Sequence, residues 1–185
     1  MKSATRLATL SILIVASLGA ILCGLGYVAG VRINITNSIP VGFYKIASRA
    51  PHRGDYVIFC PPAQAIFSLA HKRGYIGSGF CPGGYGEMMK QIMAVEGDSV
   101  AFRDSGVYVN GQRLAFSTPL SRDPSGRLLP ALRMEHQMGK SELLLMTDQS
   151  ASSFDARYFG PVTLSQMVAV VSPLWIWRSG RAAIN

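Results

Sequence analysis

The sequence has few cysteine, histidine and acidic residues, and these shortages exclude several classes of protein. Its 185 residues include 3 Cys, 3 His and 10 Asp or Glu. The cysteines and histidines are scattered, at Cys23, Cys60, Cys81, His52, His71 and His136. Because no C-x-x-C pair or Cys/His cluster is present, we expect neither a metal centre nor a cofactor. No His-Asp spacing suggests a classical catalytic triad, and three cysteines are too few for a disulfide-rich knot.

Charge is also scarce and is unevenly divided between the two signs. Charged residues make up 15% of the chain, with 18 Lys or Arg against 10 Asp or Glu and a net charge of +8. A mean hydropathy of +0.25 is too apolar for a disordered tail. The basic excess is compatible with a nucleic acid or an anionic membrane as partner. Because the chain lacks an aromatic and basic RNA-binding pattern, we expect no nucleic-acid partner and favour the lipid bilayer.

The longest stretch without charge lies at the N-terminus. After Lys2 and Arg6 no charged residue occurs until Arg32, and residues 7–30 are mostly apolar. This length predicts a helix that crosses ~30 Å of hydrocarbon. The two preceding basic residues predict a cytoplasmic N-terminus in the inner membrane, with the rest of the chain in the periplasm. The alternative is a signal peptide cleaved near residues 28–30, which would leave a periplasmic protein.

Residues 1–30 are therefore expected to be a membrane anchor or signal segment, and residues 31–185 an exported domain that is mainly β. Residues 31–44 alternate between apolar and polar side chains, which predicts one extended segment with Thr36 and Ser38 on its polar face. Asn110-Gly111 follows a second alternating run and predicts a type I′ hairpin. Several short strands with turn signals indicate an antiparallel, barrel-like β domain.

Two segments rich in Pro, Gly and polar residues interrupt this pattern, residues 61–87 and 117–141. We interpret them as insertions or long loops, the first with a short helix at 65–72. Cys60 and Cys81 flank most of the first insertion in similar contexts, Phe-Cys-Pro-Pro and Phe-Cys-Pro-Gly. In an oxidising periplasm a disulfide between them would contribute about 3 kcal/mol. Two reduced thiols are the alternative.

Ser38 and Lys90 are the candidates for chemistry. Ser38 is followed by Pro40 and Gly42, which would bend the chain away from its hydroxyl, but a serine nucleophile needs a base. Lys90 shares a strand face with Met88 and Ile92, and an apolar environment lowers the pKa of an amine. A neutral lysine could then accept the serine proton. Taken alone, a lysine that turns its amine outward to water is the simpler interpretation.

Four ordered motifs resemble those of type I signal peptidases. They are Asn34-x-Thr36-x-Ser38-x-Pro40-x-Gly42-x-Tyr44, then Arg53-Gly54-Asp55-Tyr56-Val57, then Met89-Lys90-Gln91 with Gly97-Asp98-Ser99-Val100, and finally Ser153-Phe154-Asp155-Ala156-Arg157-Tyr158-Phe159-Gly160. The short spacing from Ser38 to Pro40 and Gly42 is most similar to the conjugative-transfer branch, the TraF-like peptidases that mature pilin subunits. Ile39 and Gln149 depart from the common signal-peptidase pattern and favour this specialised branch.

The resemblance implies a signal-peptidase-like β fold and a serine endopeptidase with a Ser38/Lys90 dyad. It also implies that the Ser38 N–H and the Thr36 hydroxyl form an oxyanion hole and that Ser153 orients the lysine amine. Asp155 resembles a residue implicated in activity, and with Arg157 it would form a structural ion pair.

The substrate implied by this resemblance is a membrane-bound precursor such as a prepilin, cleaved by hydrolysis or joined head to tail. Other conjugative transfer proteins are further candidate partners. A general leader peptidase and a non-catalytic component of the transfer apparatus remain as alternatives.

Overall fold

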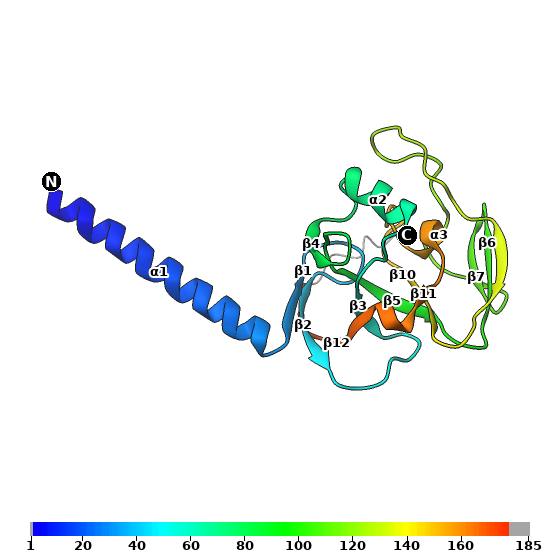
Figure 1. The fold of residues 1–185 in the computed structure, drawn as a ribbon, viewed down its shortest axis with the longest axis horizontal. Helices are drawn as coiled ribbons and strands as arrows, with labels where there is room; N and C mark the ends of the chain where they lie inside the picture. Colours follow the sequence, from blue (N-terminus) through cyan, green and yellow to red (C-terminus); the bar gives the residue numbers. More distant parts are fainter. Residues whose placement is uncertain (1, 178–185) are drawn as a thin grey trace, which may run out of the picture.

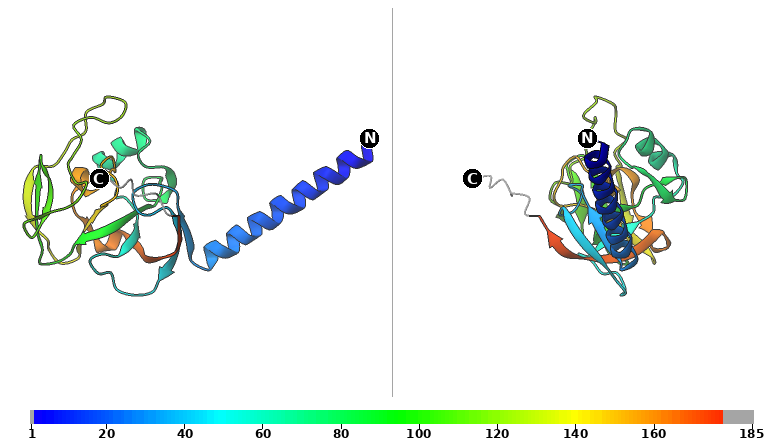
Figure 2. Two further views of the ribbon diagram at one scale, coloured as in Figure 1. Left: turned by 180° about the vertical axis from the view of Figure 1, so that it is seen from behind. Right: turned by 90° about the vertical axis from the view of Figure 1, so that its left-hand side faces the viewer.

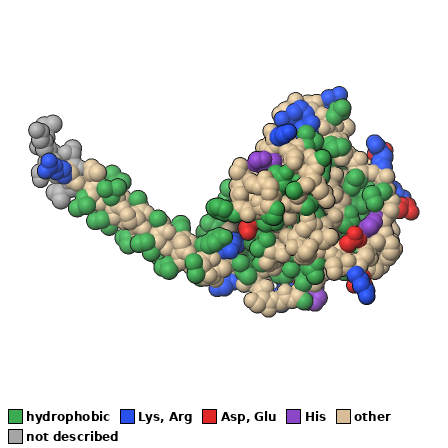
Figure 3. All heavy atoms as spheres, in the orientation of Figure 1, with side chains coloured by type: hydrophobic (Ala, Val, Ile, Leu, Met, Phe, Trp, Pro, Cys, Tyr) green, Lys and Arg blue, Asp and Glu red, His purple; other side chains and the backbone are tan. Residues whose placement is uncertain are grey.

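The computed structural model describes residues 2–177, and it consists of a long N-terminal helix and a β domain (Figures 1 and 2). Helix α1, Lys2–Val28, projects from one end of the domain. Its residues Thr9–Val28 are long and apolar enough to cross a membrane, and none of that stretch is buried against the domain. Hydrophobic side chains cover the helix in Figure 3. Its exposed apolar surface is the kind that a bilayer would cover.

The larger of two sheets has seven strands in the order β1-β2-β12-β3-β5-β10-β11, and all of its pairs are antiparallel. The strands are β1 (Val31–Asn34), β2 (Gly42–Ala47), β3 (Tyr56–Phe59), β5 (Met88–Ala94), β10 (Glu142–Met146), β11 (Val162–Thr163) and β12 (Met167–Ile176). Strand β5 lies between β3 and β10, with Lys90 opposite Val57 and Ile92 opposite Leu145. Because β5 is paired on both sides, its side chains have well-defined positions.

The second sheet has four strands and lies at the end of the domain away from α1 (Figures 1 and 2). Its strands are β6 (Ser99–Arg103), β7 (Gly106–Val109), β8 (Gln112–Arg113) and β9 (Met134–Gln137), in the order β8-β7-β6-β9. Asn110 and Gly111 join β7 to β8 with φ angles of 50° and 79°. Two consecutive positive φ angles are those of a type I′ turn, as the Asn-Gly pair predicts.

The remaining elements are α2 (Ala65–Lys72), β4 (Ser78–Cys81), α3 (Ala156–Phe159) and the 3-10 helix η1 (Leu164–Gln166). Helix α2 has the predicted bounds, and a disulfide joins Cys60 to Cys81 around it. The main core packs under this insertion, where Phe67 and Ala70 of α2 are buried together with Ile92 of β5 and Leu145 of β10. The insertion is therefore part of the folded core and not a loose lid.

Several sequence-based expectations about strands are corrected by the structure. Residues 31–44 are not one extended segment, because β1 ends at Asn34 and a turn separates it from β2. The expected apolar face fails with it: Ile35 is 82% exposed and Tyr44 is fully buried. A period of two assigns faces only while the chain stays extended. Residues 134–137, expected in a loop, form β9 because they pair with β6.

At the C-terminal end, Ser172 and Pro173 divide an apolar run and predict two strands, residues 168–171 and 174–177, but the single strand β12 extends from Met167 to Ile176. Pro173, which cannot donate a backbone hydrogen bond, falls at a register shift against β2 and does not end the strand. The mainly β, antiparallel architecture behind an N-terminal apolar helix is confirmed. Residues 178–185 of the expected exported domain lie outside the described residues.

Candidate active site

Ser38 lies in the turn between β1 and β2 and not on a strand. The two strands pair from Asn34 and Gly42 outward, so residues 35–41 are outside the β ladder. A glycine is required at position 42, because a Cβ there would lie 2.1 Å from the carbonyl oxygen of Trp175. The half-buried Ser38 is thus presented at the end of a hairpin whose base packs tightly on β12.

Lys90 meets Ser38 across the sheet. Its Nζ lies 2.8 Å from Ser38 Oγ and 2.8 Å from Ser153 Oγ, although the three residues are far apart in the sequence. The Lys90 side chain is only 2% exposed, so the interpretation that it turns outward to water is wrong. Because burial penalises the charged amine, the pKa of Lys90 falls from 10.5 to about 8; Asp155 raises it and Arg157 lowers it by smaller amounts.

Asp155 and Arg157 support the loop that carries Ser153. They form a buried, bidentate ion pair, with Arg157 Nε 2.7 Å from Asp155 Oδ1 and Nη2 2.8 Å from Oδ2. Asp155 also accepts the Arg157 backbone N–H and so caps α3. The Arg157 guanidinium donates further bonds to the carbonyl oxygens of Ala151 and Phe116. Asp155 therefore affects the pKa of Lys90 by electrostatic interaction, while its hydrogen bonds are to Arg157.

Thr36 lines the same cleft as Ser38, but its hydroxyl points at another residue. Thr36 Oγ1 donates to Asn34 Oδ1 at 2.8 Å, and the Thr36 backbone N–H donates to the same oxygen at 3.1 Å. The Thr36 side chain is exposed, so its hydroxyl has room to turn toward a bound substrate. An oxyanion role for this hydroxyl requires that rotation.

A cleft of about 320 Å³ opens over Ser38 and Lys90. Its walls come from β1 and the following turn, from the start of β5, and from the disulfide-closed insertion. The lining residues include Arg32, Ile33, Ile35, Ile58, Tyr75, Ile76, Glu87, Met88, Met89 and Phe154. Tyr75 is held by a hydrogen bond from its hydroxyl to Asp123, a residue of the long 117–133 loop. The cleft combines apolar side chains with polar and charged ones, among them Arg32, Glu87 and Lys90.

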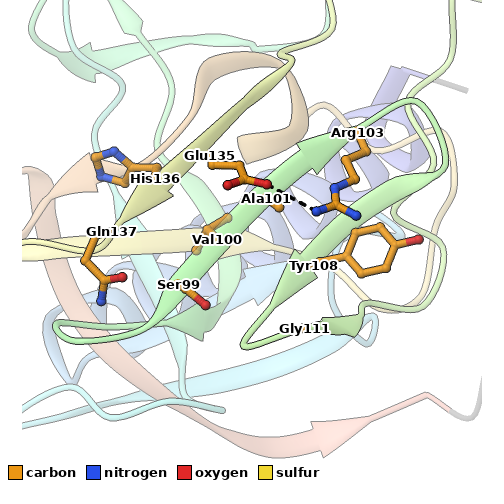
Figure 4. A pocket seen from close by; sticks show the side chains of 9 residues that line it. All are labelled: Ser99, Val100, Ala101, Arg103, Tyr108, Gly111, Glu135, His136 and Gln137. Atoms are coloured by element: carbon orange, nitrogen blue, oxygen red, sulfur yellow. Dashed lines mark hydrogen bonds and ion pairs between the residues drawn. The ribbon is translucent and has the colours of Figure 1, made fainter.

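A second, larger depression of about 520 Å³ lies on the four-stranded sheet and does not include Ser38 or Lys90 (Figure 4). The side chains of Arg103 and Glu135 pair across it at 3.2 Å. His136 also lines it, but its imidazole Nε2 lies 2.7 Å from Glu142 Oε2, so the ring pairs with a carboxylate and not with a serine. This depression therefore lacks an assembled nucleophile and base.

The structure brings together Ser38, Lys90 and Ser153, places Thr36 beside them, and sets Asp155 and Arg157 behind them. Sequence reasoning missed Asn34, which belongs to the first motif but had no assigned role. An amide side chain at the end of a strand, just before a turn, is a recognisable signal for a local hydrogen-bonding role. The cleft-lining Tyr75 carries no comparable signal, and Phe154 lies in the last motif without an assigned role, because folding alone brings both side chains to the cleft.

Comparisons with known proteins place this geometry in a family context. Residues 4–177 match the family described as signal peptidase, peptidase S26. A plasmid transfer protein TraF of Escherichia coli is 49% identical over 89% of this chain and 93% of its own length. A conjugal transfer protein TraF of Agrobacterium fabrum is 32% identical over 85% of this chain and 90% of its own length. Signal peptidase I V of Bacillus subtilis is 24% identical over 78% of this chain and 81% of its own length.

Proposed function

Because the chain belongs to the S26 signal peptidase family, with relatives that act in conjugal transfer, we propose that it is a membrane-anchored serine endopeptidase with a Ser38/Lys90 dyad. Its proposed substrate is a membrane-bound precursor of the transfer system, such as a prepilin. The observation that carries the proposal is the contact of the buried Lys90 Nζ with Ser38 Oγ at 2.8 Å. A serine hydroxyl becomes a useful nucleophile when such a base removes its proton.

In the proposed reaction the Lys90 amine acts first as a base and then as an acid. Neutral Lys90 takes the Ser38 proton while Ser38 Oγ attacks the scissile carbonyl carbon. As the peptide C–N bond breaks, the lysine returns the proton to the leaving amine, and an ester links the substrate to Ser38. A water molecule or a substrate amine then loses a proton to Lys90 and attacks the ester carbonyl carbon. As the ester C–O bond breaks, Lys90 returns that proton to Ser38 Oγ, which restores the dyad. Ser153 Oγ, also 2.8 Å from Nζ, directs the amine toward Ser38.

The proposed anchor is α1, retained and not cleaved. The junction after the helix is integrated into the domain, since Ile46 N donates to Gly30 O at 2.9 Å. Arg32 stacks on Tyr27 with its guanidinium carbon 3.8 Å from the ring centre and donates to Tyr27 O. Cleavage at residues 28–30 would break these contacts. The basic Lys2 and Arg6 support a cytoplasmic N-terminus and a periplasmic domain.

This anchor would hold the cleft close to the bilayer. Ser38 follows the end of α1 at Val28 by ten residues. Large exposed apolar side chains occur on β1, on the turn after it and on β12, namely Ile33, Ile35, Leu174, Trp175 and Ile176. Exposed apolar patches of this kind favour contact with a membrane. Confinement to the membrane plane would raise the effective concentration of a membrane-bound precursor.

The substrate would bind as an extended segment along the free edge of β1, which is the first strand of its sheet. The relatives favour a conjugative substrate over a general leader peptide: identity is 49% to a TraF protein and 24% to a signal peptidase I. The non-catalytic alternative gives no reason for burying a lysine beside Ser38, which is costly when nothing else is gained.

The test is processing of the cognate precursor by purified full-length protein in detergent. We expect Ser38→Ala and Lys90→Ala each to abolish processing while the circular dichroism spectrum is retained. The matched controls are Ser48→Ala and Lys45→Ala, which remove an exposed serine and an exposed lysine of the same region. Processing by a folded Ser38→Ala or Lys90→Ala variant would refute the dyad.

A further inference from the structure

Asn34 holds the turn that carries Ser38 from inside. It is the last residue of β1, it is only 4% exposed, and its side chain uses both ends of the amide. The Nδ2 group lies 2.7 Å from the carbonyl oxygen of Thr36, 2.9 Å from that of Ile39 and 3.2 Å from that of Pro40. Oδ1 accepts from the backbone N–H and the hydroxyl of Thr36. These five contacts bracket Ser38 on both sides.

The turn needs such support because the sheet does not provide it. The β1/β2 ladder closes at the Asn34 and Gly42 pair, and no ladder bond of that hairpin reaches residues 35–41. The carbonyl oxygens of Thr36 and Ile39 converge on the Asn34 Nδ2 group, and that of Pro40 accepts both from Nδ2 and from the Tyr44 hydroxyl. A side-chain amide donates and accepts at once, whereas a carboxylate of the same shape only accepts.

We propose that Asn34 is a positioning residue that sets the Ser38 hydroxyl against Lys90 by fixing the backbone of the turn. This inference rests on the proposed peptidase function and adds a residue to it. The Asn34 side chain is hydrogen-bonded to Thr36, Ile39 and Pro40 and to neither the Ser38 nor the Lys90 side chain, so it acts through the backbone of the turn. Its loss should change the alignment of the nucleophile and leave the burial of Lys90 intact.

The test compares Asn34→Asp and Asn34→Ala with wild type in the full-length protein, using the cognate precursor in detergent. Asp keeps the size and both acceptor contacts but loses the donor. We expect kcat to fall about 100-fold, the loss that follows a misplacement of about 1 Å, with KM changed by less than about threefold. The pH midpoint of kcat should stay that of wild type, because Lys90 remains buried.

The matched control is Asn110→Ala. The Asn110 amide also holds a turn, by accepting from Ser99 N and donating to Asp98 Oδ1, but in the four-stranded sheet. We expect Asn110→Ala to lower the melting temperature about as much as the Asn34 variants do, with kcat unchanged. Folded Asn34 variants with kcat within about threefold of wild type would overturn the proposal. So would failure of both Asn34 variants to fold, since the role of Asn34 would then be structural alone.

Ser38→Ala, assayed in parallel, distinguishes failure of the proposed peptidase function from failure of the positioning role of Asn34. If Ser38→Ala still processes the precursor, the proposed function itself fails. If Ser38→Ala is inactive and the Asn34 variants are fully active, the dyad stands and only the positioning role is refuted.

Discussion

In the proposed dyad the buried amine of Lys90 must be neutral to accept a proton, so raising the pH from 7 to 9 should increase the processing rate. Burial lowers the pKa of Lys90 from 10.5 to about 8. With that pKa, about a tenth of the enzyme carries a neutral lysine at pH 7 and about nine-tenths at pH 9, so kcat/KM should rise roughly tenfold. With the ordinary value, only about 0.03% would be neutral at pH 7.

The assay is kcat/KM for the cognate precursor between pH 6 and pH 10, with full-length protein in detergent. A rise that levels off near pH 8 to 9 is the expected profile. A kcat/KM that is independent of pH over this range, or that still rises tenfold for each pH unit above pH 9, would refute the argument that burial lowers the pKa of Lys90. Asp155 and Arg157 are the charged groups that act on the amine besides burial, and their opposite effects partly cancel.

The same shift in pKa makes a prediction about stability. The folded-state pKa lies below the unfolded value, so the unfolded chain binds more protons between about pH 8 and 10.5, and stability rises with pH through that window. Below about pH 8 the charged, buried lysine lowers the free energy of unfolding by about 3 kcal/mol. Lys90→Met should therefore be inactive yet more stable than wild type at pH 7, with the gain shrinking toward pH 10. A lower melting temperature for Lys90→Met at pH 7 would contradict this account.

Three further outcomes are expected. Replacing Cys60 and Cys81 together by Ala should lower the free energy of unfolding in urea by about 3 kcal/mol, because the disulfide joins residues that are 21 positions apart; an unchanged value would show that the bond contributes nothing. Asp155→Asn should cost about 3 to 5 kcal/mol by leaving buried Arg157 without its partner, whereas wild-type stability with lost processing would indicate a direct catalytic role for Asp155. Mass spectrometry of the product should distinguish the two fates of the ester on Ser38, since a head-to-tail product is one water lighter than the linear one.

The features that the sequence predicted correctly are those that depend on neighbouring residues. An uncharged stretch predicts α1, and an Asn-Gly pair predicts the turn at Asn110, because length, apolarity and positive φ angles are properties of short segments. The helix at Ala65–Lys72 was predicted with its observed bounds. The motifs also name Ser38, Lys90 and Ser153, whose side chains meet in the structure at 2.8 Å, and their catalytic roles stay a prediction.

Tertiary structure decided what those residues do to one another. The turn at Ser38 breaks a pattern that favours a strand, because side chains pair its carbonyl groups in place of a sheet: the Asn34 amide donates to Thr36 O and Ile39 O, and Pro40 O accepts from Asn34 and the Tyr44 hydroxyl. Lys90 lies 52 residues from Ser38 in the chain, and only the pairing of β5 between β3 and β10 buries its amine there. Its lowered pKa follows from that burial. Alternation along a strand assigns a side chain to a face, but water is excluded from that face by elements distant in the sequence, and so the chemistry of Lys90 is a property of the fold.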